Sequence, residues 1–198
     1  MTLHPPLLPA PELAAQLKAG GAAIFPTDTL PALAAAPNHA SQLWELKDRP
    51  QHKPVILMGA DAEALFALLG TAVQPAWRDL AQAHWPGALT LVLPARGAMA
   101  QLLNPGGSSL GLRVPACAQA LELLRLSGPL ATTSANRSGE PPCLSAEEAA
   151  ERFADLPLLA PATWPQPSGT ASTVLRWCEP GRWQLLRRGA VMPAGLQP

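Results

Sequence analysis

The sequence has little charge. Only 14% of its 198 residues are Asp, Glu, Lys or Arg, and the 14 basic and 14 acidic residues give a formal net charge of zero. A large basic surface for nucleic acid needs clustered Lys and Arg, so this composition argues against one and leaves room only for a local patch. Hydrophobic residues make up 48% of the chain, a content typical of folded domains and not of disordered chains.

Cysteine and histidine are scarce as well. Cys117, Cys143 and Cys178 are odd in number, lie far apart and form no CxxC pair. We therefore expect no disulfide framework and a reducing compartment. The four histidines are scattered, and no two of them have the spacing of metal ligands. The sequence alone thus indicates no metal-binding residues, and we expect no tightly bound prosthetic group.

Long apolar runs are missing. No run reaches the roughly 18 residues that a membrane-spanning helix needs. The N-terminal stretch MTLHPPLLPAPEL has no basic segment followed by an apolar core, so we expect no secretory signal. These features favour a cytoplasmic protein without membrane contact. The length suits one domain with a full core, and we expect a single domain over residues 1–198.

Short apolar runs alternate with helical patterns along the chain. Strands are predicted at residues 22–26, 54–58, 89–93, 110–114, 129–133, 172–177 and 183–187, and helices at 11–19, 40–47, 61–69, 76–84, 118–126 and 145–153. Asp61 is placed to cap one of these helices, and Ser145 and Glu148 are expected to form a capping box at the start of another. The alternation predicts an α/β fold in which helices cover a sheet. The proline-rich stretch 157–169 is expected to be a loop, either a mobile flap or plain surface.

Positive charge gathers on one predicted loop. Lys47, Arg49 and Lys53 lie within seven residues, between a helix and a buried strand, and the chain has only three lysines in all. Three neighbouring cations repel one another unless they are solvated or hold an anion. Phosphate suits them, because Arg offers a planar fork and Lys a compact charge. A solvated loop is the alternative interpretation.

Polar residues follow a second predicted strand. The turn Thr132 to Ser138 offers hydroxyl, amide and backbone donors, and ligands of open α/β sheets bind at such strand ends. A turn leading into the helix at Ser145 is the alternative interpretation. The polar loop PTDT at 26–29 could face the same cleft. Arg113 lies inside an apolar strand, where it needs a substrate carboxylate or an internal salt bridge as its partner.

Motifs for covalent or nucleotide-loop chemistry are absent from the sequence. It contains no Ser-His-Asp arrangement, HExxH or GxxxxGK[ST]. The pattern therefore favours catalysis by positioning and charge stabilisation.

Seven stretches, in this order, resemble the YrdC/TsaC family of threonylcarbamoyl-AMP synthases. They are PTDT at 26–29, KDRPQHKP at 47–54, WPGALT at 85–90, LGLRVP at 110–115, TSANRSG at 133–139, STV at 172–174 and RRG at 187–189. Each stretch alone is weak evidence for the family, but the seven together span most of the chain in a consistent order and are specific. The resemblance implies an open twisted mixed sheet covered by helices, in the short, single-domain form of the family.

The resemblance also implies a reaction. Such enzymes combine L-threonine, bicarbonate and ATP, with Mg²⁺ bound to the ATP, and release pyrophosphate and threonylcarbamoyl-AMP. Other proteins of the pathway transfer the threonylcarbamoyl group to adenosine 37 of tRNA, and contact with tRNA or double-stranded RNA has been attributed to the fold. By the same resemblance, ATP is held by Lys47, Arg49, Lys53, Ser109, Ser134, Asn136 and Arg187, with Lys47 and Arg49 catalytic, and threonine by Thr29, Arg113, Thr132 and Ser172.

One stretch departs from the family pattern. PTDTLPAL stands where PT(E/D)TVYGL is usual, so Leu30-Pro31-Ala32 replaces a Val-Tyr-Gly turn, and Pro31 fixes φ in a turn that usually has the freedom of a glycine. This departure favours a second hypothesis, a non-catalytic RNA-binding or regulatory module on the same fold. A third hypothesis is carbamoyl transfer to another acceptor, as in hydrogenase-maturation proteins, but the chain lacks their zinc-binding and acylphosphatase-like motifs.

Overall fold

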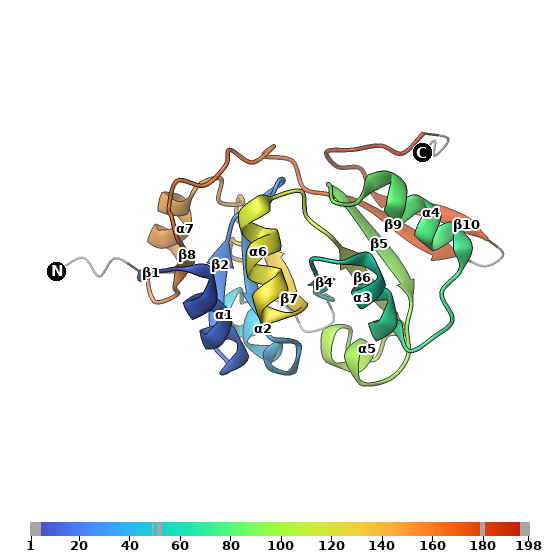
Figure 1. Cartoon of the computed structure of the whole chain (residues 1–198), viewed down its shortest axis with the longest axis horizontal. Coiled ribbons are helices and arrows are strands. Elements are labelled where there is room, and N and C mark those ends of the chain that lie inside the picture. The colour runs from blue at the N-terminus through green and yellow to red at the C-terminus, as the bar shows by residue number, and fades with distance from the viewer. Residues whose placement is uncertain (1–4, 49, 51–52, 179–180, 195–198) are drawn as a thin grey trace.

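The fold is built on one mixed sheet of ten strands (Figure 1). The computed structural model describes residues 5–48, 50, 53–178 and 181–194. Across the sheet the order is β1-β8-β2-β3-β7-β4-β6-β5-β9-β10, with both parallel and antiparallel neighbours. The strands are β1 (Leu7–Leu8), β2 (Ala22–Phe25), β3 (Ala32–Ala35), β4 (Ile56–Met58), β5 (Leu89–Pro94), β6 (Ser109–Arg113), β7 (Leu130–Ser134), β8 (Leu158–Leu159), β9 (Thr173–Cys178) and β10 (Arg182–Arg187). The predicted open mixed α/β sheet is confirmed.

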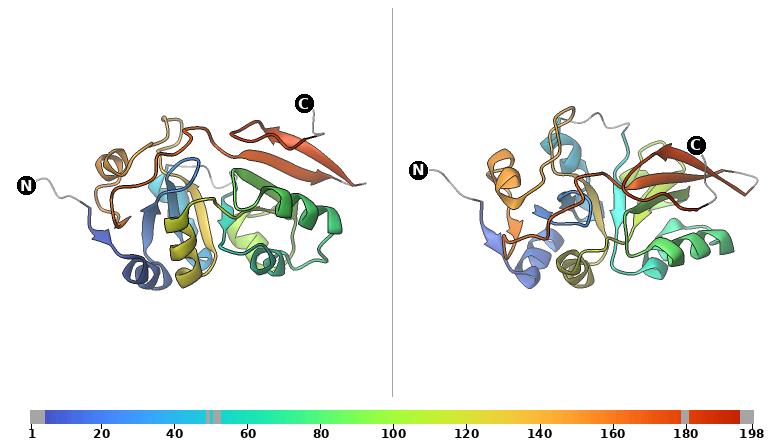
Figure 2. Two further views of the ribbon diagram at one scale, coloured as in Figure 1. Left: turned by 45° about the horizontal axis from the view of Figure 1, so that its top comes forward. Right: turned by 90° about the horizontal axis from the view of Figure 1, so that it is seen from above.

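Seven α-helices lie in the described part of the chain. They are α1 (Ala10–Lys18), α2 (Ser41–Leu46), α3 (Ala62–Phe66), α4 (Pro75–His84), α5 (Ala98–Leu103), α6 (Ala118–Ser127) and α7 (Ala146–Arg152). None of these described helices is long and apolar enough to cross a membrane. The sheet is strongly twisted, so that β9 and β10 run across the direction of β2 (Figure 2).

The two faces of the sheet are covered differently. Residues paired across neighbouring strands point to the same side, so Phe25, Ala34 and Met58 share one face and Ile24, Leu33 and Leu57 the other. The first face packs against α1 and α6, at the end of the sheet that holds β2, β3 and β7. The second face packs against α2, α3, α4, α5 and α7. Over β4, β6, β5 and β9 the first face is open, and the candidate site lies there.

Most predicted elements are present within a few residues, but several observed ones were not predicted. The largest omission is β3 at the centre of the sheet, because its Ala-Leu-Ala-Ala sequence is buried on both faces and so shows no alternation. The prediction of a loop over 157–169 is wrong at Leu158–Leu159, which pair with β1 and β2. Helix α5 and strand β1 were also missed.

Both predicted N-caps are present. The Asp61 side chain accepts from the Ala64 amide at 2.8 Å, and Ser145 Oγ accepts from the Glu148 amide at 3.2 Å. The Glu148 carboxylate accepts from the amide of Leu144 and not from that of Ser145, so the reciprocal bond lies one residue earlier than in a capping box.

We expect Asp61→Ala to lower the free energy of unfolding by about 1 kcal/mol, because the α3 amide loses its acceptor. Asp61→Ser keeps a side-chain oxygen at the cap and is the matched control. Urea unfolding of the three proteins measures the difference. Equal stability of Asp61→Ala and wild type would contradict the capping role.

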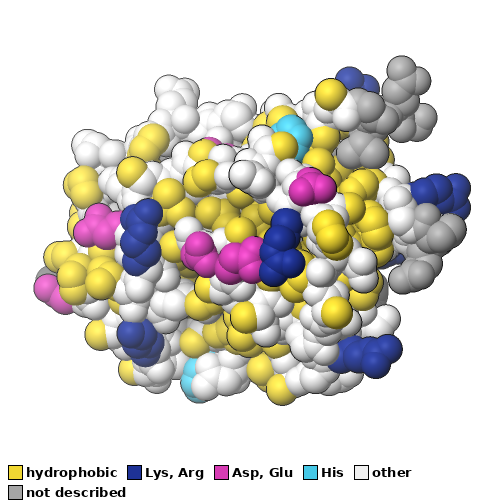
Figure 3. All heavy atoms as spheres, turned by 45° about the vertical axis from the view of Figure 1, so that its right-hand side comes forward, with side chains coloured by type: hydrophobic (Ala, Val, Ile, Leu, Met, Phe, Trp, Pro, Cys, Tyr) yellow, Lys and Arg dark blue, Asp and Glu magenta, His cyan; other side chains and the backbone are white. Residues whose placement is uncertain are grey.

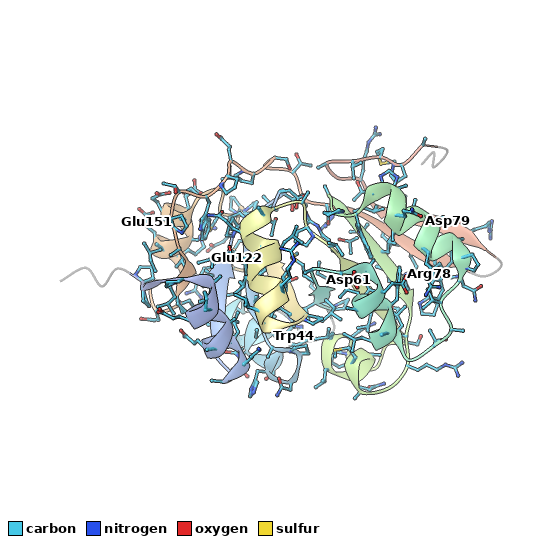
Figure 4. All side chains as sticks on the ribbon, in the orientation of Figure 1. Trp44, Asp61, Arg78, Asp79, Glu122 and Glu151 are labelled. Atoms are coloured by element: carbon cyan, nitrogen blue, oxygen red, sulfur yellow. The ribbon has the colours of Figure 1, made fainter. Side chains whose placement is uncertain are left out.

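Figure 4 labels Asp61 and Arg78. Arg78 forms an exposed ion pair with Glu63 (Nη2 to Oε2, 2.7 Å), which joins α4 to α3.

Candidate active site

A cavity of about 590 Å³ occupies the open part of the first face. Its floor is made by side chains of β4, β5, β6, β7 and β9, and its rim by the loop before β3, the segment before β4 and the end of β10. The residues around it are polar at both ends and apolar in the middle. They include Thr29, Lys53, Ile56, Thr90, Val92, Asn104, Ser109, Gly111, Arg113, Thr132, Ser134, Ser172, Arg176 and Arg187.

Positive charge dominates this cavity. Its described lining contains four cationic side chains, Lys53, Arg113, Arg176 and Arg187, and no acidic residue. On the face shown in Figure 3, by contrast, Lys and Arg side chains lie scattered among Asp and Glu. In a protein with zero net charge, four cations without an acidic residue in the described lining thus surround one hollow, which suits an anionic ligand.

Arg113 is held at one end of the cavity by three groups. Its Nη2 donates to Asp28 Oδ1 at 2.7 Å, its Nη1 to Thr29 Oγ1 at 2.7 Å and its Nε to the Gly87 carbonyl at 3.0 Å. A guanidinium has five N–H donors, so two have no partner among the described residues. Burial lowers the pKa of Arg113 from its ordinary value, and the Asp28 carboxylate opposes this shift. The internal salt bridge, one of the two partners considered for Arg113 from the sequence, is thus present. The two remaining N–H donors of Arg113 could still bind a carboxylate.

The loop that carries Thr29 is fixed by its own hydrogen bonds. Thr27 Oγ1 donates to the Leu30 carbonyl at 2.6 Å and accepts from the Thr29 and Leu30 amides. Among described residues other than glycine, only Asp48 has a positive φ. The turn therefore needs no glycine, and Pro31 fits it without backbone strain. From the other side, the Ser168 and Gly169 amides donate to the Asp28 and Thr29 carbonyls, so the segment after β8 crosses to this loop.

Two buried hydroxyls, those of Thr90 and Ser172, lie next to Arg187 in the cavity lining. Ser172 Oγ and Thr90 Oγ1 lie 2.8 Å apart, and both residues are buried. Arg187 donates from Nε to the Ser172 carbonyl at 3.0 Å and from Nη2 to Ser172 Oγ at 3.2 Å. Ser172 thus orients a cation, beyond the threonine contact that the resemblance implies.

The middle of the floor is apolar and flat. Gly111 is paired with Ile56 on one side and with Val92 on the other. A Cβ at Gly111 would lie only 2.8 Å from Ile56 Cγ2, so no side chain fits there without displacing its neighbours. The glycine keeps open the space between the two polar ends of the cavity.

Thr132 contributes an unpaired hydroxyl to this middle region. The residue is 1% exposed, it lines the cavity beside Ile56, and its Oγ1 has no hydrogen-bond partner among the residues that the structure describes. Buried hydroxyls are rarely left without a partner. The free hydroxyl therefore indicates a polar ligand atom at this point.

The structure brings most of the predicted site residues to the cavity. Thr29, Lys53, Ser109, Arg113, Thr132, Ser134, Ser172 and Arg187 all line it. Lys47 and Asn136 are not among the described lining residues; Asn136 belongs to the turn that follows β7, and the Lys47 ammonium donates to Asn136 Oδ1 and to the Ser134 carbonyl. The prediction for Arg49 falls outside the described residues.

Among the lining residues that were not singled out from the sequence, four bear on the geometry or charge of the site. Thr90 and Gly111 lie inside stretches that carried the resemblance, and Arg176 follows Val174 at strand period on the same face of β9, so a signal was present for these three. Asn104, whose Nδ2 donates to the Ser109 carbonyl at 3.0 Å, had none.

The buried thiols do not belong to this chemistry. Burial raises the pKa of Cys117 and of Cys143, which keeps both thiols protonated. The described residues also hold no group of three or more His, Cys, Asp and Glu for a metal ion.

The sequence matches the Sua5_yciO_yrdC family, described as telomere recombination, over residues 15–189. It is 39% identical over 142 residues to a threonylcarbamoyl-AMP synthase of Serratia proteamaculans, covering 69% of this chain and 75% of that protein. A threonylcarbamoyl-AMP synthase of Bacillus subtilis is 37% identical over 144 residues, covering 70% of this chain but 41% of the longer relative.

A solved structure extends this similarity to three dimensions. Sua5 of Pyrococcus abyssi, complexed with L-threonine, superposes with a TM-score of 0.83 and 32% identity. The match covers 91% of this chain and 54% of that protein, so the chain spans about half of it.

Proposed function

Because this chain belongs to the Sua5/YciO/YrdC family, we propose that it is a threonylcarbamoyl-AMP synthase. It joins L-threonine, bicarbonate and ATP, forms threonylcarbamoyl-AMP and releases pyrophosphate. Its relatives in Serratia proteamaculans and Bacillus subtilis carry this name, and the Pyrococcus abyssi structure holds L-threonine.

The observation that carries the proposal is the charge and polarity of the cavity. All three substrates bear carboxylate, carbonate or phosphate groups, and the lining offers four cations without an acidic residue among the described side chains. Catalysis of this kind depends on neutralising phosphate charge and on holding the reactants in line.

We assign the two ends of the cavity to the two larger substrates. Arg113 and Thr29 bind the threonine carboxylate, with Ser172 beside them, and Thr132 faces the carbamate that forms between the ends. Lys53, Ser109, Ser134 and Arg187 bind ATP. The donors of Arg113 that have no described partner support the threonine end. The Thr132 hydroxyl, which has no partner among the described residues, supports the middle position, and the exposed Lys53 supports the ATP end.

The chemistry follows from this arrangement. Bicarbonate supplies carbon dioxide by losing hydroxide, and the threonine nitrogen attacks this carbon dioxide. The nitrogen gives up one proton, which joins the hydroxide to form water, and a carbamate forms. A carbamate oxygen then attacks the α-phosphorus while the bond to the pyrophosphate oxygen breaks. The cations stabilise the charge that builds on the leaving pyrophosphate.

Mg²⁺ enters as part of the ATP complex. The described residues offer no cluster of carboxylates, histidines or thiolates for a resident ion, so the phosphates supply its ligands. The segment after β8, bonded to the Asp28 and Thr29 carbonyls, serves as the lid that keeps water from the carbamate.

The product is a reactive mixed anhydride, and other proteins must use it. We propose that the reaction takes place in the cytoplasm. The partners of this chain are then the tRNA-modification proteins that transfer the threonylcarbamoyl group. Binding of tRNA or double-stranded RNA to this chain is part of the same proposal, restricted to a local patch by the zero net charge.

Incubating the chain with ATP, bicarbonate and L-threonine tests the proposal. Threonylcarbamoyl-AMP and pyrophosphate should appear together and in equal amounts, by mass spectrometry and a phosphate assay. Omitting threonine or replacing it with L-valine should abolish the product. A chain that makes no product with any amino acid would be a non-catalytic module.

A further inference from the structure

The ammonium of Lys47 is enclosed by the protein. Lys47 is 1% exposed, and its Nζ donates to the Ser134 carbonyl at 2.5 Å, to the Asn136 carbonyl and to Asn136 Oδ1 at 3.0 Å. A lysine ammonium has three N–H donors, and three protein acceptors face it here. Lys47 is not among the described residues that line the cavity.

The turn after β7 is fixed by further bonds on every side. The Ser138 amide donates to the Lys47 carbonyl at 2.9 Å, and the Ala135 amide donates to the Pro31 carbonyl at 2.9 Å. Asn136 Nδ2 donates to the Arg137 and Glu140 carbonyls, at 2.9 and 2.8 Å. With its nitrogen facing two carbonyls and its oxygen facing an ammonium, the Asn136 amide has only one orientation that satisfies its neighbours.

This orientation sets the direction of the Ser134 hydroxyl. Ser134 Oγ lies 2.6 Å from Asn136 Oδ1, which can only accept, so Ser134 must donate its single proton there. Ser134 also lines the cavity. Only the lone pairs of its oxygen are left to face a ligand.

We infer that Lys47 is a positioning residue that acts through Asn136 and fixes Ser134 as a hydrogen-bond acceptor toward the cavity. The ligand group at Ser134 then carries an N–H or O–H. A ribose hydroxyl of ATP and the amino group of threonine both fit this description, and a bare phosphoryl oxygen does not. The inference rests on the proposed function only for the names of these two ligands.

Lys47→Met and Lys53→Met form a matched pair, because the two lysines come from one loop but only Lys53 faces the cavity. Calorimetric titration with inorganic triphosphate should show a loss of about tenfold or more in Lys53→Met, as expected for one charged contact. Lys47→Met should keep its triphosphate affinity within about twofold. Its rate of product formation should nevertheless fall by at least about tenfold, because the turn loses its buried cation.

Lys47→Arg separates positioning from charge. A guanidinium can serve a phosphate but cannot occupy the enclosed site of the ammonium, so Arg should not restore turnover. Full turnover in Lys47→Arg, unchanged turnover in Lys47→Met, or a loss of triphosphate affinity equal to that of Lys53→Met would each overturn the inference. A wild-type chain that binds triphosphate yet makes no product would count against the proposed function alone.

Ser134→Ala tests the direction of the hydrogen bond and spares the contacts of Lys47 with the backbone. Affinity should fall about fivefold to tenfold for one donor ligand. If a ribose hydroxyl is the donor, Ser134→Ala should lose affinity for ATP but not for 2′,3′-dideoxy-ATP. If the threonine amine is the donor, Ser134→Ala should lose affinity for L-threonine. An equal loss of inorganic triphosphate binding, or no loss with any of these ligands, would overturn the inference.

Discussion

Replacing Arg113 with Met is expected to lower the affinity for L-threonine by roughly a hundredfold, since hydrogen bonds to a charged group contribute about 1.5–3 kcal/mol each. Arg113 is buried, it lines the cavity, and two of its N–H donors have no partner among the described residues. The affinity for ATP should stay within about threefold, because the phosphates are held elsewhere. Calorimetric titration with each substrate measures both.

Stability has to be separated from binding in this variant. Arg113→Met leaves the Asp28 carboxylate without its partner, and breaking a buried pair in this way costs about 3–5 kcal/mol. The double variant Asp28→Asn with Arg113→Met removes both charges and should recover most of the stability. Its threonine affinity should remain as low as in the single variant. Recovery of threonine binding in the double variant, or equal losses for threonine and ATP, would contradict the role of Arg113.

Gly111→Val should reduce product formation by roughly a hundredfold or more, because a side chain there fills the space in which the two substrates must meet. A Cβ alone would lie 2.8 Å from Ile56 Cγ2 and 3.5 Å from Thr90 Cγ2. The crowding should also lower the free energy of unfolding by about 1–3 kcal/mol. Product formation and thermal unfolding give the two effects.

A relief variant distinguishes crowding from a general loss of structure. Gly111→Ala should be strained against Ile56, and Gly111→Ala with Ile56→Ala should be less strained than the single change, because the clashing methyl is gone. Activity should recover in part together with stability. Full activity in Gly111→Val would mean that the reaction does not take place over this floor.

The strands and helices that follow simple rules were predictable from the sequence. Apolar runs bounded by turn residues gave β4, β5 and β6, and Asp61 marked the start of α3. The central strand β3 was not predictable, because alanines buried on both faces have neither alternation nor strong strand preference. The short strands β1 and β8 exist only through pairing with each other and with β2, which no local pattern encodes.

Most residues of the candidate site were predictable from the sequence, but which of them are buried and which contact one another was not. The sequence placed Lys47 and Lys53 on one cationic loop, yet Lys47 is buried and absent from the described cavity lining, whereas Lys53 is part of that lining. Charge runs are usually solvated, so nothing local indicates that one lysine turns inward. Arg113 needed a partner on physical grounds, but its identity as Asp28 depends on a contact between residues 85 positions apart.

We propose that one cavity brings L-threonine and ATP together on the open face of the sheet. A crystal structure of this chain with L-threonine and a non-hydrolysable ATP analogue tests it most directly. The threonine carboxylate should lie within hydrogen-bond distance of the Arg113 guanidinium, the amine should point to the middle of the cavity beside Thr132, and the α-phosphate should lie on the Lys53 side. Threonine bound elsewhere, or with its carboxylate away from Arg113, would contradict the account.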